Sequence, residues 1–224
     1  MRKHIIWTLL IMSLINFASV KTTDMSGFSA VFQGLAGVDW ATGQVSTFLL
    51  VLNLGIQALF VFFIMNKVDE LLSLGPYLVV RSSRKVFLQK IQLELLGIVS
   101  LLTSLMLVVN LIFSFPLNTG EIKAIILVFV AYLINFLFWG NVVVGLLLLY
   151  VSKSWVYFSV IVTLLFLQIG SAHNLYVSLF VAGSIDVLEN TLLVFVGKFI
   201  ILFVSYVLLS WLVNHYEFKG DNKR

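Results

Sequence analysis

Six long stretches with almost no charge divide this chain, and they restrict its fold more than any other feature. Five carry no Asp, Glu, Lys or Arg, and the last is interrupted only by Lys198. Each holds the roughly 20 apolar residues that a helix needs to cross a bilayer. No stretch alternates with period two as a β-barrel strand would, so the backbone must satisfy its hydrogen bonds within helices. The sequence therefore predicts an all-α membrane protein.

The composition supports one transmembrane domain over residues 1–224. Hydrophobic residues make up 61% of the chain and charged residues 11%, whereas a soluble domain carries about 25% charged residues. No polar stretch is long enough for a second, soluble domain. The fold class that we predict is a six-helix transmembrane bundle. Its spans are predicted at about 4–20, 46–66, 91–113, 124–150, 155–174 and 191–213.

The distribution of basic residues predicts the orientation of the bundle. With both termini in the cytoplasm, eleven of the fourteen basic residues fall on the cytoplasmic side. The outer loops then keep Lys21 and Lys123. The opposite orientation would reverse this bias, against the positive-inside rule. We therefore expect a multi-pass protein of the cell membrane with cytoplasmic termini.

The first stretch has a second interpretation as a cleaved signal peptide. It begins with Arg2 and Lys3 and ends near Ala18 and Ser19, as a secretory signal does. Its apolar part is longer than a typical signal core, and Phe17 to Val20 form a poor cleavage site. A retained first helix is the better interpretation, while cleavage would leave five spans.

The connection between the second and third spans, residues 67–90, is the most informative part of the sequence. Acidic Asp69 and Glu70 precede leucines, as in a short helix. Gly75-Pro76 then predicts a break, and a basic group follows it. These cations are typical of positive-inside anchors. That interpretation leaves the acidic pair and the Gly-Pro break unexplained, whereas a surface that binds a partner protein would explain both.

This connection resembles the cytoplasmic loop of small type-2 ABC-exporter permeases, which occur in Gram-positive bacteria beside peptide-antibiotic genes. The similarity lies in Asp69-Glu70, in Gly75-Pro76-Tyr77 and in the run from Val80 to Leu88. In that family the loop forms a coupling helix that docks on the ATPase subunit. The resemblance implies that the residues coupled to the ATPase are Asp69, Glu70, Tyr77, Arg81, Ser83, Arg84 and Lys85.

The same resemblance implies a topology and a set of partners. The family has six spans, cytoplasmic ends and an outer re-entrant hairpin, to which about 175–190 is similar. The implied partners are a separate ABC ATPase, a second identical or sister permease chain and membrane lipid, with no nucleic acid. The implied function is export of an amphipathic peptide or hydrophobic compound. A helix held on two spans can transmit a rigid-body motion of the ATPase.

Polar residues inside the spans are candidates for a translocation path. Lys198 is the clearest, because a lysine within a span is costly and often functional. We expect it to snorkel to the outer interface or to pair with Glu189 or Asp186. The other candidates are Asn53, Gln57, Asn110 and Asn135. Such amides more often join helices through hydrogen bonds than bind a substrate.

The sequence favours a protein that is not an enzyme and has no cofactor. It has no cysteine, and its three histidines lie far apart without the spacing of a zinc protease. Gly197-Lys198-Phe199 lacks the upstream glycine and the Ser or Thr of a phosphate-binding loop. ATP hydrolysis would therefore require a separate chain. We expect neither catalytic residues nor a metal site.

Two other functions fit a six-span chain of this size. One is the substrate-binding subunit of an energy-coupling importer, which docks through small residues on its first helix. Here the first span is mainly Leu, Ile and Trp, which argues against it. The other is a membrane immunity protein that binds a peptide toxin without transporting it. An associated ATPase would distinguish the exporter from the immunity protein.

Overall fold

The computed structural model describes most of the chain from residue 46 onward. It covers residues 11, 13–14, 46–81, 83–114, 119–149, 152–171, 174–184 and 186–215, without the side chains of 76–81 and 114. All regular structure in these residues is helical. Five helices there are long and apolar enough to cross a membrane. They are α3 (Thr47–Arg81), α4 (Arg84–Ser114), α5 (Thr119–Leu148), α6 (Lys153–Ser171) and α9 (Thr191–His215).

These five helices match the last five predicted spans. The predicted first span, 4–20, lies almost wholly outside the described residues, although Ile11, Ser13 and Leu14 are helical. The predicted hairpin, 175–190, contains two short helices, α7 (Leu175–Ser178) and α8 (Asp186–Glu189). The all-helical class is confirmed, and the described residues hold five helices able to cross a membrane, while six spans and a re-entrant hairpin stay predictions.

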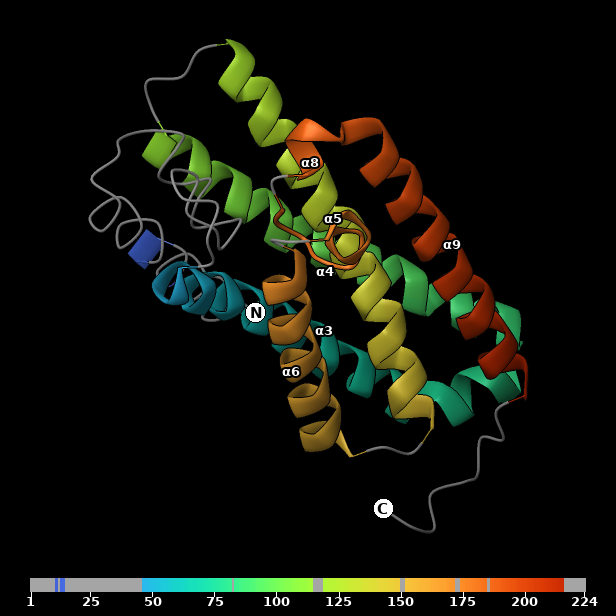
Figure 1. Ribbon diagram of the computed structural model, residues 1–224. Helices are drawn as coiled ribbons and strands as arrows, with labels where there is room; N and C mark the ends of the chain where they lie inside the picture. The colour runs from blue at the N-terminus through green and yellow to red at the C-terminus, as the bar shows by residue number, and fades with distance from the viewer. Residues whose placement is uncertain are drawn as a thin grey trace.

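Helix α5 forms the centre of the bundle. It contacts α3, α4, α6, α8 and α9, and in Figure 1 it runs between α6 and α9. Phe60 of α3 stacks on Phe136 of α5, with ring centroids 3.9 Å apart and planes 13° from parallel. Tyr132 and Val143 of α5 are fully buried. The outward faces of α4, α6 and α9 instead expose large apolar side chains, which suits contact with lipid.

Helices α3 and α4 extend beyond their predicted spans. They contain 35 and 31 residues, which corresponds to about 50 Å each at 1.5 Å per residue. The hydrocarbon core of a bilayer is only about 30 Å thick. The excess length lies at the end where α3 finishes and α4 begins, which carries Lys67, Lys85, Lys90 and Lys153. We call it the basic end of the bundle.

The break predicted at Gly75-Pro76 is absent, because α3 continues through both residues to Arg81. Pro76 removes one backbone hydrogen bond to Leu72, but the helix tolerates this loss. Helix α3 ends at Arg81 and α4 begins at Arg84 instead. There the Ser83 hydroxyl accepts a hydrogen bond from the Val86 N–H at 3.3 Å, as a helix N-cap does. The capping serine therefore sets the boundary, and the proline does not.

Candidate functional site

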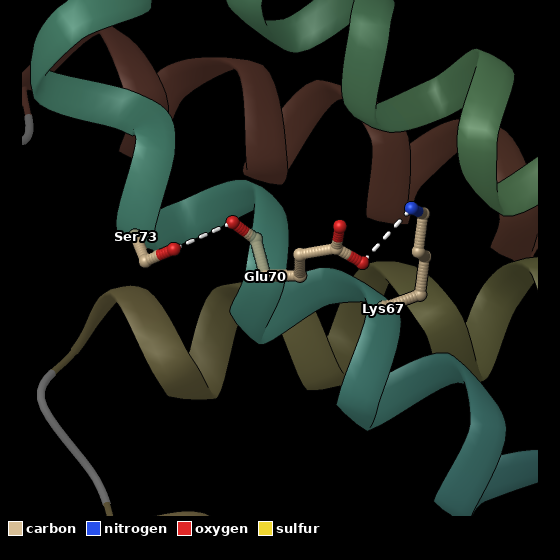
Figure 2. Close-up of polar contacts among 3 residues, drawn as sticks. All are labelled: Lys67, Glu70 and Ser73. Carbon is tan, nitrogen blue, oxygen red and sulfur yellow. Dashed lines mark hydrogen bonds and ion pairs between the residues drawn. The ribbon is translucent and has the colours of Figure 1, made fainter.

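The acidic pair at the basic end makes its ion pairs within this chain. Glu70 receives the Lys67 ammonium at 2.9 Å, and the Ser73 hydroxyl donates to the Glu70 carbonyl at 2.7 Å. Figure 2 shows these three residues in succession along α3. Asp69 pairs with Lys153 at the start of α6. Asp69 therefore links α3 to α6, and the acidic pair is explained without a partner protein.

Arg84 also has a partner inside the chain. Its guanidinium donates to the backbone carbonyl of Asn214, near the end of α9. The last carbonyls of a helix have no intrahelical donor, so a cation there is favourable. Arg84 thus binds the start of α4 to the end of α9, and Asp69 binds α3 to the start of α6.

Of the remaining predicted coupling residues, the structure describes the side chains of Ser83 and Lys85. Ser83 caps α4, as described above, and Lys85 is exposed, as are Gln89 and Lys90 farther along α4. The side chains of Tyr77 and Arg81 lie outside the described residues. The exposed residues of α4 therefore offer part of a surface for a partner at this end.

The ion pair between α3 and α6 gives a first testable prediction. Changing Asp69→Lys should destabilise the bundle, and adding Lys153→Asp should restore most of the loss, because the pair re-forms with reversed charges. The expected coupling is about 0.5–1 kcal/mol, since the pair is only partly buried. Thermal unfolding in detergent measures it. The same swap at Lys67 and Glu70, within one helix, should change the unfolding temperature much less.

A buried polar cluster joins α3, α5 and α6 in the middle of the bundle. The Asn53 amide donates to the Tyr132 hydroxyl at 3.0 Å, and the Gln57 amide donates to Asn53. Gln57 also donates to Gln168 at 3.2 Å, and Gln168 donates to the Gly183 carbonyl at 2.9 Å. Neighbouring polar groups thus hold three helices and the α7–α8 segment together, as interhelical hydrogen bonds do in membranes.

Lys198 neither snorkels nor forms an ion pair in the described part of the chain. It is 1% exposed. Its ammonium donates to the backbone carbonyls of Ser178 at 3.0 Å, Val181 at 2.6 Å and Leu179 at 3.3 Å, and to the side-chain oxygen of Asn135. Neither Glu189 nor Asp186, the acidic partners that we expected, accepts one of these hydrogen bonds. Four neutral oxygens surround the charge.

The segment that surrounds Lys198 connects α7 to α8 without regular structure. Its backbone carbonyls are bonded by side chains from three helices. Besides Lys198, the Trp139 indole donates to Phe180 at 3.1 Å and the Asn135 amide to Leu179 at 3.4 Å. The Gln168 amide donates to the Gly183 carbonyl. Irregular backbone within a membrane protein requires such partners.

Gly197 allows α9 to approach this segment closely. A Cβ atom at Gly197 would lie 2.7 Å from a methyl carbon of Leu179, closer than two carbons can pack. The glycine beside Lys198 therefore brings α9 within reach of the carbonyls.

A third polar cluster lies where α4, α5 and α9 meet. Asn141 accepts from the Gln92 amide at 2.8 Å and donates to the Ser205 hydroxyl at 3.0 Å. Crevices of about 450 and 400 Å³ flank α9 at this point, and Asn141 lines both. Their other walls are mainly apolar.

The predicted path residues fall into separate places inside one bundle. Asn53 and Gln57 share the central cluster, Asn135 and Lys198 share the α7–α8 segment, and Asn110 is buried on α4. The first four placements suit residues that join helices, whereas the Asn110 side-chain oxygen has no hydrogen-bond partner among the described residues. A role in a path stays a prediction. Tyr132 and the mid-span Trp139 were not predicted as members of these clusters. A mid-span Trp needs a partner for its N–H, which was the available signal.

The described residues contain no cluster of His, Asp or Glu able to hold a metal ion. Comparison with known protein families, curated proteins and solved structures gives no match to this chain. The fold and its apolar surface define the class: a helical, multi-pass membrane protein. Of the five membrane helices in the described residues, four surround α5, with polar clusters between them.

Proposed function

We propose that this chain is the transmembrane permease subunit of an ABC exporter in the cell membrane. A separate ATPase chain binds the basic end, which faces the cytoplasm together with both termini. A second permease chain, identical or related, completes the path. The cargo is an amphipathic peptide or a hydrophobic compound. Six spans and an outer re-entrant hairpin complete the proposed topology.

One observation carries the proposal: at the basic end, α3 is bound to α6 through Asp69–Lys153, and the start of α4 is bound to α9 through Arg84–Asn214. A force on this end of α3 and α4 would therefore also act on α6 and α9. Such a connection is what a coupling segment needs to transmit a rigid-body motion.

Exposed charge and apolar crevices add support. Lys85 and Lys90 project from the basic end and could meet acidic groups of an ATPase. The two crevices beside α9 have volumes within the range of ligand sites, roughly 300–1,000 Å³. Their apolar walls suit a hydrophobic cargo.

Charge reversal at the basic end tests the proposal. The chain with Lys85→Glu and Lys90→Glu should lose at least about tenfold of its ATPase when purified from its source membranes, because favourable charge pairs become repulsive. The readouts are the ATP hydrolysis that co-purifies and the identity of the ATPase. Arg84 is left intact, since it binds α9.

The matched control is Lys123→Glu, an exposed lysine at the opposite end of the bundle. It should leave the ATPase bound. Absence of any ATPase from the wild-type preparation, or equal recovery with the doubly reversed chain, would contradict the proposal. An immunity protein would give the first of these results.

A further inference from the structure

The Lys198 ammonium occupies a site that has the ligands of a bound monovalent cation. Its neighbours are the carbonyl oxygens of Ser178, Leu179 and Val181, at 2.6 to 3.3 Å, and the side-chain oxygen of Asn135. Rings of neutral carbonyl oxygens are how proteins replace the hydration shell of K⁺. Ammonium makes the same contacts as hydrogen bonds.

We propose that these four oxygens form a monovalent-cation site, which Lys198 fills in the native chain and which a free ammonium ion fills once the side chain is shortened. The lysine is thus a structural cation attached to α9. This inference concerns the folding of the α7–α8 segment and is independent of the proposed transport function.

The ligands of the site suit a single positive charge. Lys198 is 1% exposed, so the four oxygens take the place of bulk water around the ammonium. The oxygens of Asp186 accept hydrogen bonds from Ser184 and Asn190. The ligands themselves are neutral, so one cation leaves no excess negative charge. A divalent cation would lack the carboxylates that hard ions prefer.

The backbone conformation explains why the site needs an occupant. Residues 179–184 are not helical, and the carbonyls of Leu179 and Val181 turn toward Lys198. Each buried carbonyl left without a donor costs about 1–3 kcal/mol. An empty site would therefore open the segment, and any small cation that fits should close it again.

The absence of cysteine from the chain allows a clean test. Ala182→Cys places a reporter thiol in the segment at a position that is 2% exposed. In the purified, detergent-solubilised chain, a maleimide should label this thiol slowly. Adding Lys198→Ala should raise the labelling rate at least about tenfold, because opening becomes easier by more than 1.4 kcal/mol.

The decisive step is chemical rescue. Ammonium or methylammonium chloride should return the labelling rate of the Lys198→Ala chain toward that of the parent. Choline chloride at the same ionic strength should not, because choline is too bulky and has no N–H to donate. Gln168→Leu is the control, since it removes the bond to Gly183 without vacating a cation site. Its labelling should rise without rescue by either amine.

Three results would overturn the proposal: unchanged labelling after Lys198→Ala, no effect of the small amines, or equal rescue by choline. A second measurement is the yield of the Lys198→Ala chain purified from membranes of cells grown with or without methylammonium. If the protein is recovered only in small amounts, a yield that rises with methylammonium supports the site, and a yield that does not change contradicts it.

Discussion

Replacing Lys198 by methionine is expected to lower the free energy of unfolding by about 3–5 kcal/mol, the largest effect of any single change considered for this chain. Methionine keeps much of the side-chain volume but donates no hydrogen bond. The Val181 carbonyl and the side-chain oxygen of Asn135 then lose the donor that Lys198 supplies, and the Ser178 carbonyl keeps only the Val181 N–H at 3.4 Å. Unfolding by SDS titration in mixed micelles measures the difference.

Ser205→Ala is the matched control for that experiment. Ser205 also lies on α9 and is buried, and its hydroxyl bonds Asn141 and the Leu202 carbonyl. Interhelical hydrogen bonds in membranes contribute about 0.6 kcal/mol on average, so the loss should stay near 1 kcal/mol. If both variants lost the same free energy of unfolding, Lys198 would stabilise the bundle no more than an ordinary polar contact does.

The second large effect is expected for Phe136→Ala, with a loss of about 2–4 kcal/mol. In water such a change costs about 3–5 kcal/mol, part of which is the transfer of the ring from solvent. In a membrane the transfer part is small, because lipid is as apolar as the core. What remains is the loss of packing against Phe60 and Tyr132. The same SDS titration measures this loss.

Phe158→Ala is the control for the aromatic change. Phe158 lies on α6 and is 60% exposed, so its ring packs little against the rest of the chain. Its removal should change the unfolding free energy by less than about 0.5 kcal/mol. If both phenylalanines gave the same loss, the stacked pair between α3 and α5 would not be part of a specific core.

The positions of the membrane helices could be predicted because their signal is local. Uncharged runs delimit α5 and α9, whose ends lie within a few residues of the predicted spans. The length of α3 could not be predicted in the same way. Its last turns follow the charged residues Lys67, Asp69 and Glu70, and Gly75-Pro76 suggested a stop that the helix does not make.

The polar clusters were predictable as residues but not as partners. Gln57 and Gln168 are 111 positions apart, so no sequence period places them together. The partners of Lys198 were harder still, because three of them are backbone carbonyls, which every residue possesses. Acidic residues nearby in sequence were the natural guess for a lysine. The folded segment offered neutral oxygens instead.

The basic residues illustrate how one signal can have two causes. Their gathering at one end was predicted from charge bias, and the structure places Lys67, Lys85, Lys90 and Lys153 together there. The resemblance assigned Asp69 and Arg84 to a partner, whereas the structure pairs both within the chain. Internal pairing does not exclude coupling, because these bonds would carry motion from the turn into α6 and α9.

The side of the membrane that the basic end faces tests the central claim most directly. In a chain without native cysteine, Gln89→Cys places one thiol at the basic end, and Lys123→Cys places one at the opposite end. A membrane-impermeant maleimide applied to intact cells should label position 123 and should reach position 89 only after permeabilisation. Labelling of position 89 in intact cells would put the basic end outside and contradict an ATPase bound there.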